Sequence, residues 1–106
     1  MSFTVTTEVF ENYTKLTLAG SLDSSTASQL QAEVQKIIPL QPQKLVMDVE
    51  KLDFMASAGL RIIIFAKQKI GATAQLILVK PQEQLQETLK MTGLIHSVSI
   101  VDQYVE

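Results

Sequence analysis

The chain contains no cysteine, no tryptophan and only one histidine, His96, in its 106 residues. Without cysteine it has no disulfide framework, no thiolate metal site and no cysteine nucleophile. A single histidine is too few for a histidine-based zinc cluster, which draws on several His, Cys or carboxylate ligands. We therefore predict no metal site and no cofactor, and the lack of disulfides permits a cytoplasmic location.

Strong charge and long apolar runs are also missing. Nine Lys and Arg against eleven Asp and Glu give a formal net charge of −2, so the chain lacks the basic footprint typical of nucleic-acid binding. The longest uninterrupted apolar run, Ile62 to Ala66, is far shorter than the roughly 20 residues that a membrane-spanning helix needs. Residues 1–6 contain no basic residue and no apolar block, so we expect no signal peptide. These absences predict a cytoplasmic protein without a nucleic-acid partner and without membrane insertion.

The spacing of the apolar residues predicts an α/β fold. Alternation predicts a hairpin of two strands, over 3–9 and 13–19, and helical spacing predicts helices over 24–38, 58–70 and 82–91. The other expected elements are buried strands at 44–49 and 75–79, a loop over 50–55, a last strand at 97–101 and a helical turn over 102–106. The length of 106 residues predicts one domain, residues 1–106. Strand–helix–strand alternation implies parallel pairing of the later strands. The domain should hold a mixed sheet of about five strands packed against three or four helices, with 44–49 and 75–79 as central strands.

The residues offer little support for an enzyme. The four glycines stand singly, so there is no glycine-rich phosphate loop. His96, near the last strand, is better explained as a surface residue than as the base of a Ser-His-Asp triad. Asp48 and Asp53, which flank the 50–55 loop, are better explained as strand-end and turn residues than as an acid–base pair. We predict a non-enzymatic protein with no catalytic residue. The alternative, a small enzyme, would be supported only by substrate turnover that persists in the Ser57→Ala variant.

The most informative segment surrounds Ser57, which the pattern places at the N-terminus of the second helix. Ala56, Ala58 and Gly59 bracket it with small residues, which would let a partner approach the backbone closely. Ahead of the first helix, Asp23 is the expected cap, because its carboxylate can accept from free backbone N–H groups at the positive end of the helix dipole.

The second helix is unusually apolar on more than one side. If Leu60 and Ile63 face the sheet, Ile62 and Phe65 lie off that stripe, beside Arg61. Left partly exposed, the two side chains would form a docking patch. The alternative is that both are buried under a neighbouring helix, and the sequence leaves the two possibilities open.

Three motifs resemble those of STAS domains, the anti-sigma factor antagonists of bacteria. Residues 54–60, Phe-Met-Ala-Ser-Ala-Gly-Leu, resemble the start of the family's second helix, which commonly reads Asp-Ser-Ser-Gly-Leu or Ser-Ser-Ala-Gly-Leu. Residues 18–23, Leu-Ala-Gly-Ser-Leu-Asp, look like its Gly-x-Leu/Ile-Asp segment, and residues 91–94, Met-Thr-Gly-Leu, are similar to the end of its third helix. The resemblance covers almost the whole chain, with matching spacing and element order.

The resemblance implies a protein-binding switch. In the family, a kinase that is itself the anti-sigma factor phosphorylates a serine at the position of Ser57. The unphosphorylated form binds that factor, which frees the sigma factor. The implied partners are thus an anti-sigma factor with serine-kinase activity and a serine/threonine phosphatase acting on phospho-Ser57. The implied partner surface consists of Asp23, Ser21, Ala56, Ala58, Gly59, Arg61, Ile62 and Phe65.

The chain also departs from the family pattern. Ala56 stands where many phosphorylated members have Asp, Ala58 replaces the second Ser, and Arg61 replaces a frequent small residue. If the missing Asp assists kinase recognition or phosphoryl transfer, regulation is altered or absent. The alternative function is therefore an unswitched STAS adaptor subunit of a transporter complex or stress-signalling assembly.

Overall fold

Strands and helices alternate along the chain in the order that the sequence predicts. The computed structural model describes residues 3–104. Its α-helices are α1 (Ala27–Ile37), α2 (Ser57–Ile70) and α3 (Glu83–Thr92). Its strands are β1 (Phe3–Val9), β2 (Thr14–Leu22), β3 (Lys44–Met55), β4 (Gln75–Val79) and β5 (Ser99–Val101), and two short 3₁₀ helices are η1 (Ile38–Leu40) and η2 (Leu94–His96).

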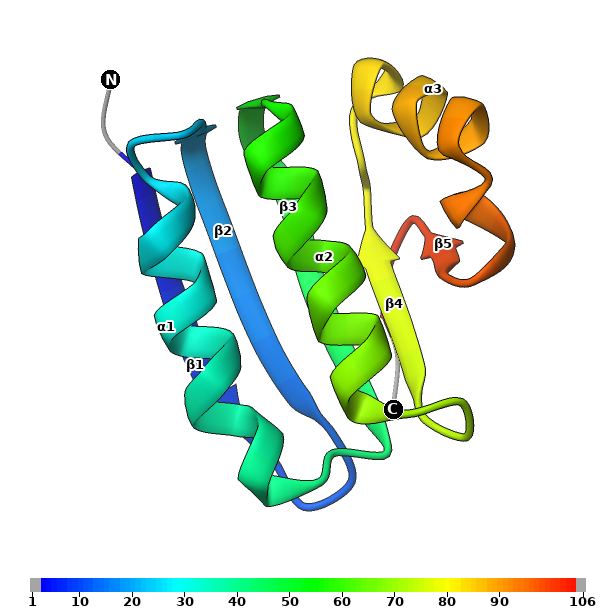
Figure 1. The fold of residues 1–106 in the computed structure, drawn as a ribbon. Coiled ribbons are helices and arrows are strands. Elements are labelled where there is room, and N and C mark those ends of the chain that lie inside the picture. Colours follow the sequence, from blue (N-terminus) through cyan, green and yellow to red (C-terminus); the bar gives the residue numbers. More distant parts are fainter. Residues whose placement is uncertain (1–2, 105–106) are drawn as a thin grey trace.

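The strands form one five-stranded sheet whose spatial order, β1-β2-β3-β4-β5, equals their order in the chain (Figure 1). β1 and β2 form the predicted antiparallel hairpin, and every later neighbour pairs in parallel. The mixed sheet is confirmed, with 44–49 and 75–79 inside it. Because β2, β3 and β4 run in the same direction, their carboxyl ends meet at one edge, where α1, α2 and α3 begin (Figure 1).

The main core lies between the sheet and the helices. α1 and α2 lie side by side on one face of the sheet, and α3 contributes two buried leucines from beyond the end of β4 (Figure 1). The fully buried large side chains of this layer are Leu16, Leu18, Leu22, Leu30, Val34, Ile37, Leu45, Met47, Ile63, Leu76, Leu78 and Leu89.

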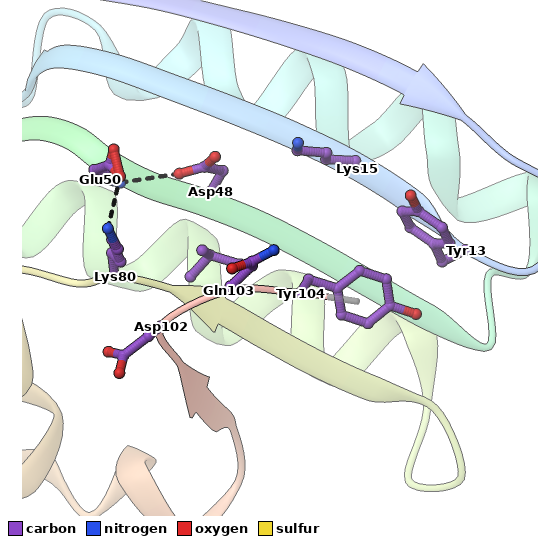
Figure 2. Close-up of a pocket in the computed structure, with 9 residues that line it drawn as sticks. Tyr13, Lys15, Asp48, Glu50, Lys80, Asp102, Gln103 and Tyr104 are labelled. Atoms are coloured by element: carbon purple, nitrogen blue, oxygen red, sulfur yellow. Dashed lines mark hydrogen bonds and ion pairs between the residues drawn. The ribbon is translucent and has the colours of Figure 1, made fainter. Parts of the chain in front are cut away.

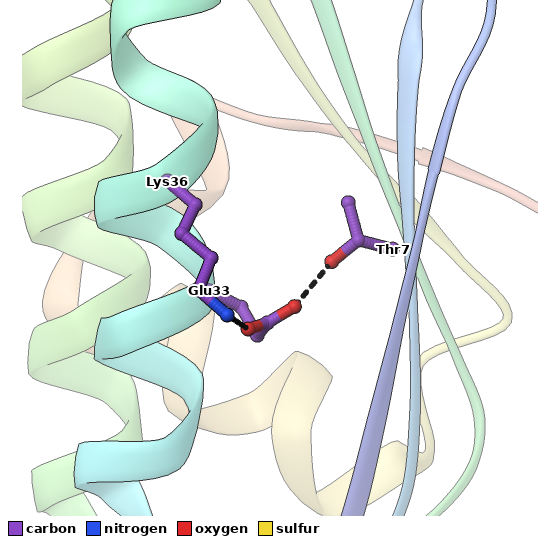
Figure 3. Close-up of polar contacts among 3 residues, drawn as sticks. All are labelled: Thr7, Glu33 and Lys36. Carbon is purple, nitrogen blue, oxygen red and sulfur yellow. Dashed lines mark hydrogen bonds and ion pairs between the residues drawn. The ribbon is translucent and has the colours of Figure 1, made fainter.

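A polar contact also joins β1 to α1 (Figure 3). The Thr7 hydroxyl donates to Glu33 Oε1 at 2.8 Å, and Lys36 Nζ pairs with Glu33 Oε2 at 2.7 Å. The Lys36 ammonium and the Thr7 hydroxyl, in that order of effect, hold the pKa of Glu33 below its ordinary value. The outer strand of the hairpin is thereby tied to the first helix by a charged side chain.

The second sheet face carries no helix within residues 3–104, yet β3 and β4 are buried there too. Val46, Ile77 and Val79 form a small apolar cluster on this face, which is packed against Tyr13 and Tyr104. The segment after β5 crosses this face, as Figure 2 shows. This cover explains why the apolar runs in β3 and β4 barely alternate.

Several expected element boundaries are wrong: the last strand begins at Ser99 rather than at 97, and the second strand continues to Leu22 rather than ending at 19. Three further differences are larger. Residues 50–55, expected as a loop, continue β3, because β2 also extends and pairs Leu22 with Met55. α1 begins at Ala27 rather than at 24, because residues 23–26 form a turn. Residues 102–104 form bends and irregular backbone rather than a helical turn, and residues 105–106 of that expected turn lie outside the described residues.

Candidate protein-binding site

The site lies where β2 and β3 end side by side. Leu22 pairs with Met55 in the sheet, and the next residue, Ala56, donates its N–H to the Leu22 carbonyl at 2.8 Å. The turn after β2, which holds Asp23, therefore lies beside the start of α2, which holds Ser57. Two segments singled out by sequence motifs are thus brought together at one edge of the sheet.

Ser57 is the first residue of α2 and is exposed. Ala56, the cap position, has extended backbone (φ −84°, ψ 171°), and its carbonyl accepts from the N–H groups of Gly59 at 3.0 Å and Leu60 at 3.2 Å. The N–H groups of Ser57 and Ala58 precede this first bond and belong to the free donors of a helix start. The predicted position of Ser57 at the helix N-terminus is confirmed.

Gly59 is buried, and its small size is required by the domain itself. A Cβ atom at this position would lie 2.6 Å from both Cγ and Cδ2 of Leu22 and 3.1 Å from Cγ of Met55. Such distances are far below van der Waals contact, so only glycine lets α2 begin this close to β2. Gly59 was singled out as an approach for a partner, but its size is explained by this internal contact.

Asp23 caps the turn that leads into α1. Its Oδ1 accepts from the Ser25 hydroxyl at 2.6 Å, the Ser25 N–H at 2.9 Å and the Thr26 N–H at 3.1 Å. Bonds from the Ser25 hydroxyl, the Ser25 N–H and Thr26 lower the pKa of the Asp23 carboxyl. The Asp23 carbonyl accepts from Ala27 N–H at 2.9 Å, which begins the helical hydrogen bonding. Asp23 therefore accepts from free backbone N–H groups as predicted, but these belong to the turn before α1. The cap position of α1 is Thr26, so the prediction that Asp23 caps the helix itself is wrong.

Thr26 fixes the same turn from inside, a role that the sequence reasoning did not assign. Its hydroxyl donates to the Ser21 carbonyl at 2.9 Å and accepts from the Asp23 N–H at 2.9 Å. Thr26 and Ser21 are both buried, so the Ser21 side chain is not part of the exposed surface. The position of Thr26, three residues after an Asp in a Ser/Thr-rich run, is the only sequence signal for this contact.

The exposed surface of α2 is smaller than the docking-patch hypothesis requires. Arg61 is exposed and Phe65 is half-buried, with Lys69 Nζ 5.7 Å from the centre of its ring. Ile62 is only 9% exposed and belongs to the main core, so its assignment to an exposed partner surface is wrong. Of the two possibilities that the sequence left open for Ile62, burial is the one observed. α1 lies beside α2 on the same face of the sheet (Figure 1).

The other polar residues considered from sequence do not assemble with Ser57. Asp48 and Asp53 line different cavities, and His96 is an exposed residue of η2 near the C-terminal end of α2. Within residues 3–104, no group of three or more His, Cys, Asp or Glu side chains is placed to hold a metal ion. In the same range, no helix combines the length and the apolar character needed to cross a bilayer.

A separate depression of about 470 Å³ lies on the sheet face that the chain after β5 crosses (Figure 2). Its charged lining includes Lys80, which lies 3.4 Å from Glu50 Oε1, and Asp48, whose Oδ1 accepts from the Glu50 N–H at 3.1 Å. Sequence reasoning missed this depression because its lining comes from segments far apart in the chain. It lies away from the helix-covered side where α2 begins.

The geometry defines a class of protein: a small α/β module that presents an exposed helix start where β2 and β3 end. The family model of the STAS domain matches residues 4–106, and the chain belongs to the STAS domain family. The matched relatives described below are anti-sigma factor antagonists, which are regulatory binding proteins rather than enzymes.

Two relatives illustrate the similarity in sequence. BtrV of Bordetella bronchiseptica, provisionally assigned as an anti-sigma factor antagonist, is 30% identical over 79 residues, or 74% of this chain and 68% of BtrV. The anti-sigma-F factor antagonist RsfB of Mycobacterium tuberculosis is 27% identical over 93 residues, or 88% of this chain and 76% of RsfB.

The solved structures share the fold. An anti-sigma factor antagonist from Mycobacterium paratuberculosis superimposes with a TM-score of 0.86 at 22% identity, covering 96% of this chain and 87% of that one. The anti-sigma factor antagonist SpoIIAA in its unphosphorylated form gives 0.77 at 19% identity, covering 97% and 90%. SpoIIAA of Bacillus in its phosphorylated form gives 0.73 at 21% identity, covering 93% and 90%.

Proposed function

We propose that this protein is a phosphorylation-switched anti-sigma factor antagonist. In its unphosphorylated form it binds an anti-sigma factor that has serine-kinase activity, at the edge formed by Ser57, Asp23 and Arg61. The kinase transfers the γ-phosphoryl group of ATP to Ser57 Oγ, with release of ADP and the hydroxyl proton. Phospho-Ser57 then releases the partner, and a serine/threonine phosphatase restores the binding form. A cytoplasmic location is part of this proposal.

The observation that carries the proposal is the exposed hydroxyl of Ser57 on the first turn of a well-anchored helix. A kinase can reach this hydroxyl without unfolding the domain, and the Leu22–Gly59 contact keeps the helix start in a fixed place. Relatives named as anti-sigma factor antagonists, and a fold shared with phosphorylated and unphosphorylated SpoIIAA, support the same function.

The physical basis of the switch is a difference in solvation. A phosphate adds about −1.5 to −2 charge, and a helix N-terminus tolerates it with a gain of roughly 0.3–1 kcal/mol. A partner packed closely over Ser57 would have to remove water from that charge. A penalty of about 3 kcal/mol weakens binding roughly a hundredfold, which is enough to release the partner while the domain stays folded.

A second function, an unswitched STAS adaptor, is favoured by one feature. Ala56 stands immediately before Ser57, where many switched members carry an acidic residue. An adaptor would use the same edge of the sheet to join a transporter complex or stress-signalling assembly. Its binding would not depend on the charge at position 57.

The test compares wild type, Ser57→Ala and Ser57→Asp as baits in lysate of the native host, with captured proteins identified by mass spectrometry. Ser97→Asp is the matched control: it adds the same charge at an exposed position near the C-terminal end of α2. A helix of 14 residues separates that end from Ser57 by about 20 Å.

We expect three baits to capture an ATP-binding serine kinase: wild type, Ser57→Ala and the control Ser97→Asp. Ser57→Asp should not capture it. Incubation of that kinase and ATP with wild type should add one phosphate, mapped to Ser57. Capture of the same proteins by all four baits would contradict the switch and support the adaptor.

A further inference from the structure

We propose that Arg61 is the intramolecular partner of phospho-Ser57, pairing with the phosphate along one turn of α2. This inference rests on the proposed function, because it concerns the regulation of the same serine. It assigns to Arg61 a positioning role in the switched-off state, in addition to any contact with the partner.

The spacing of the two residues carries the inference. Ser57 and Arg61 both lie within α2, four positions apart, and both are exposed. Residues at this spacing lie on the same face of a helix, with Cβ atoms about 5–6 Å apart. The long arginine side chain readily spans this distance, and its planar guanidinium matches the oxygens of a phosphate.

The order of the charges is also the favourable one. An anion one turn N-terminal to a cation agrees with the direction of the helix dipole, whereas the reverse order is weaker. The phosphate would be on the first residue of α2, and Arg61 would follow it toward the C-terminus. Both the dipole and the cation therefore act on the phosphate in the same sense.

Among the described residues, no anion forms an ion pair with Arg61 in the unphosphorylated protein. Within residues 3–104 the ion pairs are Lys36 with Glu33 and Lys80 with Glu50, and Arg61 belongs to neither. Among the described residues, Asp23, Asp53 and Glu83 carry carboxylates at the same edge of the sheet, and Glu83 is exposed at the start of α3. The Asp23 carboxylate is already bonded to Ser25 and Thr26, and Asp53 is exposed at the end of β3.

The pairing has a consequence for the switch. While Ser57 is unmodified, the Arg61 guanidinium is free to contact an acidic group of the partner. Once Ser57 is phosphorylated, the phosphate draws the guanidinium away from that contact. One modification then both introduces a charge that the partner cannot desolvate and removes a cation that the partner uses.

The test uses protein with phosphoserine genetically encoded at position 57, so that it does not depend on any host kinase. The phosphate is titrated by phosphorus NMR in the wild-type background, in Arg61→Gln and in Lys69→Gln. Lys69 is the matched control, an exposed cation of the same helix two turns beyond Arg61. Lys69 lies about 18 Å along the helix from residue 57, which exceeds the screening length of about 8 Å at physiological salt.

We expect the second pKa of the phosphate, about 6 when unperturbed, to rise by about 0.3 in Arg61→Gln and to stay unchanged in Lys69→Gln. The difference should disappear at about 1 M salt, where the screening length is about 3 Å. Coincident titrations of the wild-type and Arg61→Gln phosphates at low salt would overturn the inference. If the host kinase leaves Ser57 unmodified while the titrations differ, the proposed function fails and the Arg61 pairing stands.

Discussion

The contact between Gly59 and Leu22 leads to a quantitative prediction for Gly59→Ala. Alanine is favoured over glycine in a helix by about 1 kcal/mol, so on propensity alone the substitution stabilises. The new Cβ, however, would lie 2.6 Å from two atoms of a side chain that is 0% exposed. Overpacking of this kind costs about 1–3 kcal/mol, so we expect a net loss of about 1 kcal/mol in the free energy of unfolding.

Leu22→Ala by itself removes buried carbon and leaves a cavity, at a cost of about 2–5 kcal/mol. In the double variant Gly59→Ala/Leu22→Ala the added Cβ enters the space that the leucine left. The double variant should therefore lose less stability than the sum of the two single variants, by at least about 1 kcal/mol of coupling.

The assay is urea unfolding followed by far-ultraviolet circular dichroism, because the chain has no tryptophan for fluorescence. Gly59→Ala/Leu16→Ala is the control, since Leu16 is equally buried in β2 but lies about 20 Å along the strand from Leu22. That pair should be additive within about 0.5 kcal/mol. Additive losses in the Leu22 pair as well would refute the steric explanation for glycine at this position.

Three further predictions concern other parts of the fold. The pKa of Glu33 is lower in the folded protein than its ordinary value of 4.5. The ionised Glu33 side chain therefore stabilises the fold above about pH 4.5, and this stabilisation is lost as the pH falls through the lower pKa of the folded state. Stability in acid titrations should therefore fall more steeply below that pH in wild type than in Glu33→Gln. Tyr104→Ala should lower the free energy of unfolding in urea by about 1–2 kcal/mol, because it uncovers the apolar cluster and ends the 4.7 Å ring contact with Tyr13. The control Gln103→Ala, at an exposed neighbouring position, should change it little. Equal losses in the two variants would contradict a packing role for Tyr104. Gly93→Ala should lower the melting temperature by several degrees, because Gly93 ends α3 at φ +78°, where an alanine costs about 1–2 kcal/mol; an unchanged melting temperature would contradict this.

Local pattern accounts for most of the fold. β1, with bounds 3–9, and β4, with bounds 75–79, follow directly from alternation and apolar runs bounded by turn residues, and α2 follows from helical spacing ended by Gly71. The end of β3 was missed because Lys51 and Asp53 suggest a loop. Their exposure is compatible with a strand only because Leu52 between them reaches the core and β2 extends alongside.

In the site too, the residues that depend on local sequence were predictable and those that depend on contacts between distant segments were not. Ser57 and Asp23 were placed by their motifs, since both act through local helix-start chemistry. The burial of Ile62 and Ser21 could not be predicted, because helical or strand spacing says which side chains share a face but not whether another element covers that face. The Leu22–Gly59 contact was invisible for the same reason: it joins two segments that only the folded sheet brings together.

The sheet order has a consequence for how the domain folds. Because each strand lies next to the one before it in the chain, the sheet can assemble in chain order, one strand after another. The cover over Val46, Ile77 and Val79 breaks this rule, since Tyr104 comes from beyond the last strand and reaches back to Tyr13 near the first hairpin turn. An intermediate with β1 to β4 assembled would hold an uncovered apolar strip on the helix-free face, and such species self-associate. A chain shortened before Asp102 would keep every strand and still resemble that intermediate.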